Sequence, residues 1–283
     1  MKYLVLYNPY SCNGNGKEEA YKLKEKLKDE LEFVCMPEIE DFDNFFRDNK
    51  EDIIICGGDG TLNYFINHTD SIKYDNNILY YSTGTGNDFY HEIGDNNKFP
   101  LNINKYLKDL PIVSVNGKDY RFLNGVGYGI DGYCCEEGDR LKKKSNKPVN
   151  YTSIAIKGLL YKFKPRNAKV TVDGYSYEFK KVWLAPTMNG KFYGGGMMIA
   201  PNQDRLNKEH TVTVVVMHGK GKLSTLIAFP SIFKGEHIEK KDMISIFEGH
   251  NITVSFDKPT ALQIDGETIL GVTEYCVRTS NNE

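Results

Sequence analysis

Short apolar runs alternate with amphipathic segments over residues 1–111 of the chain. Four runs have the length and composition of buried strands, and three segments between them carry apolar residues at helical spacing. The predicted strands are Tyr3–Tyr7, Glu32–Met36, Asp52–Cys56 and Ile78–Ser82, and the predicted helices are Lys17–Glu30, Phe42–Asn49 and Thr61–Asn67. Alternating strands and helices build parallel sheets, so this region is predicted to be a doubly wound α/β domain.

After about Pro111 the pattern changes to β-branched and aromatic runs separated by turn residues. The predicted strands here are Ile112–Val115, Tyr120–Leu123, Lys169–Val172, Lys181–Pro186, Thr211–Met217, Ile252–Phe256 and Ala261–Ile264, with one helix at about Thr152–Tyr161. We therefore predict an α/β domain of residues 1–111 and a mostly antiparallel β domain of residues 112–283. Whether the tail of the second domain contacts the first is left open.

The composition is that of a folded protein, with 40% apolar and 26% charged residues in a chain of 283. A formal net charge of −2 gives no overall attraction to nucleic acid, so no nucleic-acid partner is expected. The six cysteines contain no CxxC pair, so we expect reduced thiols. No run approaches ~20 apolar residues, and we expect no transmembrane segment and a cytoplasmic location, peripheral to the inner membrane face at most.

The loop Gly57–Thr61 (GGDGT) follows an apolar strand and precedes a helical segment. Consecutive glycines let backbone N–H groups approach a phosphate, and the helix N-terminus adds a positive dipole end. Asp59 would repel polyphosphate, so a divalent cation such as Mg²⁺ is the natural mediator. The alternative is a tight turn in which Thr61 caps the helix.

Two further loops strengthen the phosphate interpretation. Ser82–Phe89 (STGTGNDF) also follows a strand, and its hydroxyls and glycines suit a phosphate or a ribose. Asn8–Lys17 (NPYSCNGNGK) lacks the glycine spacing of a P-loop and the Ser or Thr after Lys17, so a P-loop NTPase is rejected. We interpret it instead as a nucleotide-side loop of another fold. No GxGxxG opens the first helix, which argues against a Rossmann dehydrogenase.

A third kind of signal is the segment Gln263–Glu267 (QIDGE), a strand that runs into a turn. A carboxylate within reach of an alcohol can accept its proton during phosphoryl transfer. Asp265 and Glu267 are therefore the candidate bases, and the sequence does not choose between them. Taken alone, the segment is better explained as a surface β-turn, and the glycine loops reverse that preference.

In this order along the chain, the motifs resemble those of the diacylglycerol kinase catalytic family, specifically the bacterial lipid kinases related to sphingosine kinases. The matching pieces are Asn8-Pro9-x-Ser11, GGDGTLN at 57–63, GTGNDF at 84–89, FLN at 122–124 with Gly127-x-Gly129-x-Asp131, YGGGM at 193–197, and DGE at 265–267. The resemblance implies a phosphofructokinase-like first domain, a β-sandwich second domain and an active-site cleft between them. It also implies transfer of the γ-phosphate of ATP to a lipid hydroxyl, such as that of diacylglycerol, presented at a membrane surface.

The family pattern assigns residues to the expected site. The nucleotide-binding positions are Asn8, Ser11, Gly57, Gly58, Asp59, Gly60, Thr61, Asn63, Thr83, Gly84, Thr85 and Asn87, and the catalytic positions are Asp59, Asp265 and Glu267. ATP and Mg²⁺ are the implied cofactors. Asp131 either completes a polar network or caps a turn, and a homodimer is left open.

Two positions depart from the family pattern. Tyr64 stands where many relatives have Glu, and Asn207-Lys208 stands where relatives carry an Asp-Gly that helps to hold a structural Mg²⁺. Replacing a carboxylate by an amide beside a cation weakens a hard-metal site. We therefore expect the accessory metal site at Asn207 to be absent or weak. Two alternative functions remain at this point, an NAD kinase-like enzyme and a catalytically silent protein that binds lipid or nucleotide.

Overall fold

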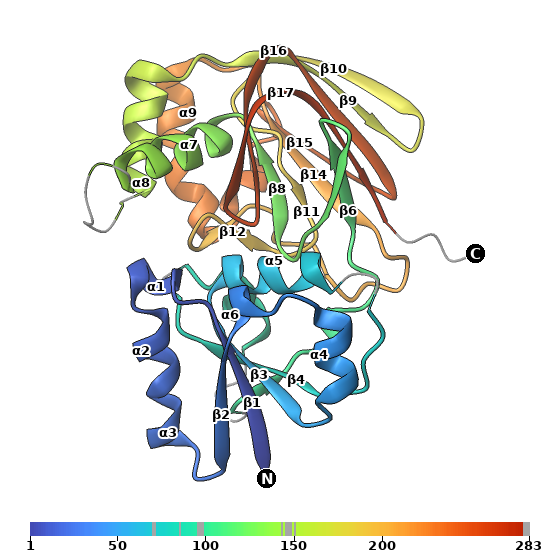
Figure 1. Ribbon diagram of the computed structural model, residues 1–283. Coiled ribbons are helices and arrows are strands. Elements are labelled where there is room, and N and C mark those ends of the chain that lie inside the picture. The colour runs from blue at the N-terminus through green and yellow to red at the C-terminus, as the bar shows by residue number, and fades with distance from the viewer. Residues whose placement is uncertain are drawn as a thin grey trace. The chain divides into compact units, whose positions relative to one another are not determined.

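The computed structural model describes residues 1–69, 72–84, 86–94, 99–142, 144, 149 and 151–279. The chain divides into two compact units, Met1–Lys108 and Asp109–Glu283 (Figure 1). All six cysteines are free thiols, as expected. No helix in the described ranges is long and apolar enough to cross a membrane.

Within its described residues, the first unit contains a five-stranded sheet in the order β2-β1-β3-β4-β5. The strands are β1 (Lys2–Tyr7), β2 (Glu30–Cys35), β3 (Asp52–Gly57), β4 (Ile78–Ser82) and β5 (Leu101–Asn102). The first four are parallel to one another, and β5 is antiparallel to β4. Ile53, Ile54 and Ile55 on β3 are completely buried, as expected for a parallel strand covered on both faces. The predicted parallel α/β architecture is confirmed.

The helical elements described in this unit are α1 (Ser11–Gly14), α2 (Gly16–Tyr21), α3 (Leu23–Lys26), η1 (Met36–Glu38), α4 (Phe42–Asp48), α5 (Asp59–His68), α6 (Asp88–Ile93) and η2 (Asn104–Tyr106). The single helix predicted over Lys17–Glu30 is wrong at its C-terminal end. Leu27 is already extended, and the Glu30 N–H donates to the Met1 carbonyl at 3.1 Å, where pairing of β2 with β1 begins. Pairing between strands therefore overrides the local helical pattern there.

The second unit is built on an antiparallel sheet that has ten strands among the described residues. They are β6 (Ile112–Val115), β7 (Lys118–Arg121), β8 (Gly125–Tyr128), β9 (Arg166–Val172), β10 (Tyr175–Val182), β11 (Thr187–Met188), β14 (Val212–Met217), β15 (Ile244–Gly249), β16 (Asn251–Ile264) and β17 (Glu267–Arg278). A separate short hairpin joins β12 (Phe192–Tyr193) to β13 (Met197–Met198). The long strand β16 pairs with β17 on one side, and with β9 and then β8 on the other. The predicted antiparallel β domain is confirmed.

The strand predicted over Lys181–Pro186 is wrong. The preceding strand β10 ends at Val182, after a shift of register beyond Phe179, and Lys181 has a left-handed backbone with φ of 53°. Leu184 forms only isolated bridges to Gly129 and Met217. The apolar run is buried because it crosses the core, and not because it lies in a regular strand.

The helical elements of the second unit are α7 (Ile130–Lys142), α8 (Tyr151–Lys157), the π-helical η3 (Gly158–Lys162), α9 (Lys222–Ala228), η4 (Phe229–Lys234) and η5 (Glu236–Glu239). The expectation of one helix was therefore wrong, since both α7 and α9 were missed. The α7 segment contains Gly132 and Gly138, which lower its helical propensity. A side chain at Gly138 would lie 2.6 Å from the ring of Tyr151, so this glycine permits close packing of α7 against α8.

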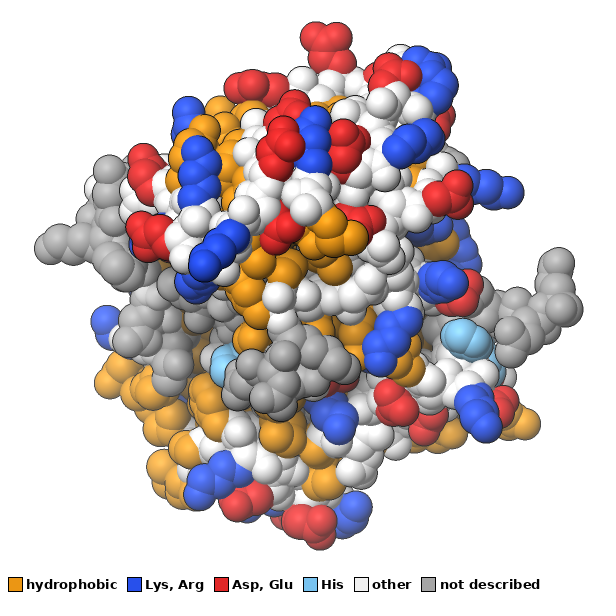
Figure 2. All heavy atoms as spheres, turned by 90° about the horizontal axis from the view of Figure 1, so that it is seen from below, with side chains coloured by type: hydrophobic (Ala, Val, Ile, Leu, Met, Phe, Trp, Pro, Cys, Tyr) orange, Lys and Arg blue, Asp and Glu red, His pale blue; other side chains and the backbone are white. Residues whose placement is uncertain are grey.

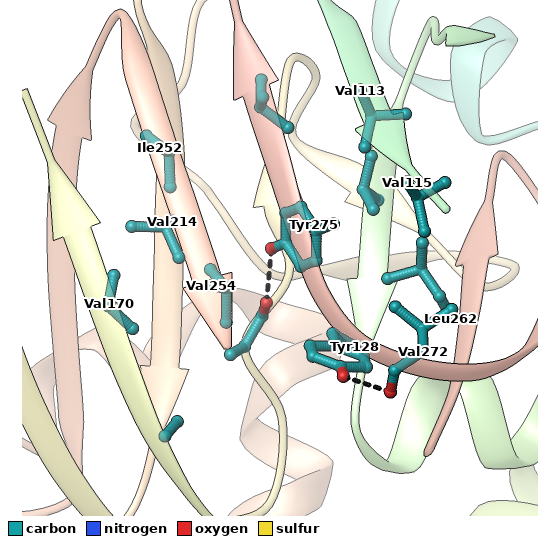
Figure 3. Packing of buried hydrophobic residues seen from close by; sticks show 14 of the residues in the cluster. Val113, Val115, Tyr128, Val170, Val214, Ile252, Val254, Leu262, Val272 and Tyr275 are labelled. Atoms are coloured by element: carbon teal, nitrogen blue, oxygen red, sulfur yellow. Dashed lines mark hydrogen bonds between the residues drawn. The ribbon is translucent and has the colours of Figure 1, made fainter. Parts of the chain in front are cut away.

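The core of the second unit is formed by buried residues from most strands of its large sheet. Val170, Val214 and Val254 lie on different strands and are completely buried (Figure 3). Two tyrosines satisfy their hydroxyls inside this core. Tyr128 donates to the Val272 carbonyl at 2.5 Å, and Tyr275 donates to the Ala185 carbonyl at 2.9 Å. Buried hydroxyls need such partners, so these bonds fix how the strands pack.

Candidate active site

Three loops of the first unit lie around the carboxyl ends of β1, β3 and β4. Tyr7 pairs with Cys56 and Gly57 pairs with Ser82, so these strand ends are neighbours. The carboxyl edge of an open parallel sheet is where such folds bind their ligands. The structure therefore brings the three predicted loops to the edge where a nucleotide would bind.

The loop Gly57–Thr61 leads directly into helix α5. Gly58 is the N-cap, and no side chain caps the helix. The Thr61 N–H donates to the Gly58 carbonyl at 3.0 Å, while Asp59 and Gly60 start the first turn. The alternative in which Thr61 caps the helix is therefore wrong. The first N–H groups of a helix lack intrahelical acceptors and favour an anion, so this end of α5 suits a phosphate.

The side chains around this loop differ in exposure. Gly60 is exposed, whereas Thr61 and Asn63 are only 3% and 8% exposed. The Asn67 amide donates to the Asn63 carbonyl at 3.0 Å. Thr61 and Asn63 thus support the loop from inside the unit, and the backbone at Gly60 is the part most accessible to a ligand.

Asp59 connects the first glycine loop to the second. Its Oδ2 accepts the Asp88 N–H at 2.8 Å, and its Oδ1 accepts the Phe89 N–H at 3.1 Å. Both donors lie in the first turn of α6, whose dipole favours a negative charge at that end. The structure thus explains a carboxylate in a phosphate loop without a cation, because its charge is compensated by α6. Each oxygen keeps further acceptor capacity for a hydrated cation.

Gly58 and Gly84 form the closest contact between the two loops. A Cβ on Gly84 would lie 2.7 Å from the Gly58 Cα, so neither loop has room for a side chain here. Asn87 has a left-handed backbone with φ of 45° and donates its amide to the Gly84 carbonyl. Its Oδ1 is buried and accepts no hydrogen bond from the described residues. An unpaired buried acceptor beside two glycine loops suits a ligand donor such as a ribose hydroxyl. Thr85, the remaining predicted residue of this loop, lies outside the described residues.

The loop Asn8–Lys17 is held by its own side chains. The Asn8 Oδ1 accepts the Tyr10 N–H at 3.0 Å, and the Asn8 carbonyl accepts the Ser11 hydroxyl at 2.7 Å. The Cys12 thiol donates to the Thr83 carbonyl at 3.1 Å and so joins the loop Asn8–Lys17 to the loop Ser82–Phe89. Asn8 and Ser11 therefore shape the loop, and Cys12 is a contributor that was not identified from the sequence. Nothing in the sequence marked Cys12, because a left-handed backbone such as its φ of 52° is not expected of a cysteine.

In the second unit, Asp265 occupies the tight turn between β16 and β17. Its Oδ1 accepts the N–H groups of Asn124 and Gly125 at 2.8 and 3.1 Å, and its Oδ2 accepts that of Leu123 at 2.6 Å. It is 9% exposed, and its φ is 46°. Three backbone donors hold this carboxylate against the segment that enters β8. Asp265 thus has the geometry of a residue that positions two segments.

Glu267 lies on the other side of the same turn, opposite Ile264. Its side chain is exposed and has no hydrogen bond or ion pair with the described residues. The turn is fixed by the bond from the Gly266 N–H to the Gln263 Oε1 at 2.7 Å. Of the two predicted carboxylates, Glu267 is the one that is exposed and has no partner among the described residues.

Arg205 places a positive charge beside the Asp265 turn. Its guanidinium donates to the Leu123 carbonyl at 3.1 Å and to the Asn124 Oδ1 at 3.2 Å. Asn189 also donates to the Leu123 carbonyl, at 2.9 Å. The FLN motif was identified from the sequence but Arg205 was not, because the two are 81 residues apart and nothing in the sequence links them.

Asp131 is buried at the N-terminus of α7. Its Oδ1 accepts the Tyr193 hydroxyl at 2.7 Å, and its Oδ2 has no partner among the described residues. Burial raises the pKa of this carboxyl to about 7, although the Tyr193 hydrogen bond acts in the opposite direction. The predicted polar network at Asp131 is therefore present, and it contains a carboxyl that changes charge near neutral pH.

Asn207 braces the loop before β14. Its Nδ2 donates to the carbonyls of Asp204 and Thr211 at 2.7 and 3.0 Å, and its Oδ1 accepts the Thr211 N–H at 2.9 Å. Two carbonyl oxygens thus converge on an amide, where an oxygen-liganded cation would otherwise satisfy them. The amide takes both acceptors, and an absent or weak accessory metal at this position stays a prediction.

We expect Asn207→Asp to make the stability of the protein depend on divalent cations. A carboxylate would face two carbonyl oxygens, so the free energy of unfolding should fall by about 1–3 kcal/mol in a chelator. Added Mg²⁺ or Ca²⁺ should restore it, whereas the wild-type protein should melt at the same temperature with or without chelator. Thermal unfolding with and without EDTA measures both, with Asn202→Asp on the exposed part of the same loop as the charge control. Wild-type melting that shifts with the chelator would contradict this role of Asn207.

The described residues contain no group of three or more His, Cys, Asp or Glu side chains placed to hold a metal ion. Charged side chains of both signs are scattered over the face shown in Figure 2.

The first unit has the fold and loops of a nucleotide-binding α/β protein, and an antiparallel β unit follows it in the chain. Residues 2–112 match the diacylglycerol kinase catalytic domain, and residues 124–278 match the YegS C-terminal NAD kinase beta sandwich-like domain. The chain therefore belongs to the family of lipid kinases that combine a diacylglycerol kinase catalytic domain with a YegS-type C-terminal domain. The predicted family and the predicted class of enzyme, a diacylglycerol kinase-like kinase, are confirmed.

Individual relatives agree with this family. The chain is 25% identical over 249 residues to YtlR of Bacillus subtilis, which is named as a candidate lipid kinase, and the match covers 81% of this chain and 77% of that protein. It is also 25% identical over 254 residues to a diacylglycerol kinase of Mycobacterium tuberculosis, covering 84% and 80% of the two chains. A crystal structure of a candidate diacylglycerol kinase from Bacillus anthracis has the same fold, with a TM-score of 0.68, 20% identity and coverage of 99% and 92%.

Proposed function

We propose that this protein is a lipid kinase that transfers the γ-phosphate of ATP to the hydroxyl of diacylglycerol or a related lipid. The observation that carries the proposal is the pair of glycine loops that Asp59 ties together at the carboxyl edge of the parallel sheet. Family membership supports the same chemistry. The acceptor would reach the enzyme at a membrane surface.

The nucleotide would lie on the backbone of the two glycine loops. The N-terminus of α5 would hold phosphate, and the unpaired Asn87 Oδ1 would accept a hydroxyl or amine proton of the nucleotide. Mg²⁺ would arrive with ATP and neutralise charge on the transferring phosphoryl group. The Asp59 carboxylate would hold this ion through its water, since both oxygens already accept backbone N–H groups.

We assign Glu267 as the general base and Asp265 as a positioning residue. Glu267 is exposed and unpaired among the described residues, so its carboxylate can reach a lipid hydroxyl and accept its proton. Asp265 is buried and occupied by three N–H donors. Its role is to fix the turn that carries Glu267.

The experiment that tests the function compares acceptors. The purified protein is incubated with labelled ATP and Mg²⁺ in mixed micelles containing diacylglycerol, phosphatidylglycerol or a sphingoid base, and separately with NAD. Label in a lipid and not in NAD is the expected result. Label in NAD alone would establish the NAD kinase alternative. ATP binding without transfer to any acceptor would establish a silent binding protein.

The titration of Asp131 predicts how stability depends on pH. The pKa of its carboxyl is about 7 in the folded protein against an ordinary value of 3.8, so the folded state holds the proton more tightly. The contribution of this group to stability is therefore most favourable below about pH 4 and declines as pH rises toward 7, by about 1.4 kcal/mol per pH unit at most. Asp131→Asn should flatten the fall in melting temperature between about pH 4 and pH 7. An unchanged slope in the variant would contradict burial of a titrating carboxyl at this position.

A further inference from the structure

Helix α9 has apolar residues on both of its faces. Ala228 is buried in the core of the second unit and Leu226 packs partly buried against that core, whereas Leu223 and Ile227, one turn apart, are 70% and 71% exposed. The outward row continues into η4 through Pro230, which is exposed, to Phe233, which is 36% exposed. A helix at the surface of a globular unit normally directs its polar residues outward. Packing against the residues that the structure describes therefore does not explain the outward face of α9.

The neighbouring segment η3 extends this apolar surface. It packs against α9, and the Lys222 ammonium group on α9 donates to the Leu160 carbonyl on η3 at 3.1 Å. Tyr161 on η3 is 75% exposed, and Ile156 on α8 is 39% exposed. The π-helical geometry of η3 is closed by the bond from the Phe163 N–H to the Gly158 carbonyl at 2.8 Å. We call the exposed residues Ile156, Tyr161, Leu223, Ile227 and Phe233 the outer apolar face.

Four exposed lysines come from the same elements as the outer apolar face. Lys157 is on α8, Lys162 on η3, Lys222 on α9 and Lys234 on η4. None of them forms an ion pair with a described residue. A lysine near an anionic bilayer raises the affinity about fivefold. Exposed apolar residues accompanied by lysines that form no ion pair are the combination found in interfacial membrane-binding elements.

A second copy of this chain fits the outer apolar face less well. A two-fold interface would bring the same surface together with itself, so the lysines of one copy would approach those of the other. Charged residues are depleted at the centres of protein interfaces, and like charges across them are unfavourable. An anionic lipid surface instead accepts the apolar side chains between its headgroups and offers phosphates to the lysines.

We infer that the outer apolar face docks the protein on an anionic bilayer, with Leu223, Ile227 and Tyr161 entering the headgroup region and the lysines at its surface. The inference rests on the proposed lipid kinase function in one respect. Docking would bring the enzyme to a lipid acceptor that stays in the membrane.

The test measures binding to vesicles without nucleotide. The intact protein is sedimented with vesicles of phosphatidylcholine and with vesicles that also contain phosphatidylglycerol. Wild-type protein should bind the anionic vesicles and not the neutral ones. The double variant Leu223→Ser/Ile227→Ser should bind anionic vesicles at least about tenfold more weakly. Lys157→Gln/Lys162→Gln should weaken binding in the same assay, and added salt should have less effect on that variant.

Matched controls separate this face from general surface properties. Leu270→Ser on β17 and Tyr175→Ser on β10 remove apolar side chains that are 60% and 73% exposed elsewhere, and Lys118→Gln with Lys180→Gln removes two other exposed lysines. These controls should bind like the wild-type protein, and every variant is checked by thermal unfolding. Equal binding of all variants would overturn the inference. A dimer that Leu223→Ser/Ile227→Ser converts to monomer in analytical ultracentrifugation would also overturn it and assign the face to a second copy.

The outcome is independent of the kinase proposal. No ATP is present, so a protein that transfers no phosphate gives the same vesicle result. If the wild-type protein phosphorylates lipid in micelles but all variants bind vesicles equally, only the docking inference fails. If the variants lose vesicle binding and no acceptor is phosphorylated by the wild type, only the proposed function fails.

Discussion

Glu267→Gln is expected to lower kcat for phosphoryl transfer by about 100-fold or more while leaving the stability of the protein unchanged. A positioned general base contributes about 10²–10⁴ to such a rate, and an amide cannot accept the proton. Because Glu267 is exposed and makes no bond to the described residues, its replacement removes no structural contact. Steady-state kinetics with a lipid acceptor measure the rate, and urea unfolding measures the stability.

Two comparisons make the Glu267 result specific. Glu274→Gln changes another exposed glutamate on the same strand, β17, and should leave kcat within about twofold. Asp265→Asn should instead lower the free energy of unfolding by about 2–4 kcal/mol, because one carboxylate oxygen that accepts a backbone N–H becomes a donor. Full activity in Glu267→Gln would remove Glu267 from the role of base. Unchanged stability in Asp265→Asn would remove Asp265 from the role of positioning residue.

Gly84→Ala is expected to weaken ATP binding at least about tenfold, equivalent to about 1.4 kcal/mol. The added Cβ would lie 2.7 Å from the Gly58 Cα and 2.6 Å from the Asn87 Oδ1, so the two loops must separate. Overpacking of this kind commonly costs about 1–3 kcal/mol. Gly58→Ala should be milder, since its Cβ would lie 3.1 Å from the Gly84 Cα. Isothermal titration with MgATP measures the series.

The control for the glycine series is Gly221→Ala. A Cβ added to this glycine would have nothing within 4 Å, its φ of −83° is not left-handed, and it lies in the second unit. Its variant should bind ATP like the wild-type protein. If Gly84→Ala also binds ATP normally, the two glycine loops are not the nucleotide site.

The parallel sheet could be predicted from the sequence because its signal is local. Strands β1, β3 and β4 are short, largely apolar runs followed by loops, and β4 has the predicted bounds Ile78–Ser82. The two glycine loops follow from the same pattern, since parallel strands place their carboxyl ends at one edge. The direction of the Asp59 side chain toward Asp88 and Phe89 could not be predicted, because it depends on the position of α6.

The parts that sequence reasoning missed depend on contacts between distant residues. Asp265 is held by N–H groups at Leu123, Asn124 and Gly125, at least 140 residues away in the chain. Arg205 contacts the same segment across a gap of about 80 residues. Helix α7 was missed because its two glycines read locally as breakers, although one of them lets Tyr151 pack closely. The nucleotide and catalytic roles of the individual residues stay predictions until the variants are measured.

The most direct test of the central claim is an unbiased search for the acceptor. A bacterial lipid extract is incubated with the purified protein, Mg²⁺ and ATP labelled in the γ-phosphate, and the products are identified by mass spectrometry. We predict that a lipid with a free hydroxyl is converted to its phosphate, and that the Glu267→Gln protein produces almost none of it. Label that appears only in a water-soluble nucleotide, or in no product while ATP is bound, would contradict the assignment as a lipid kinase.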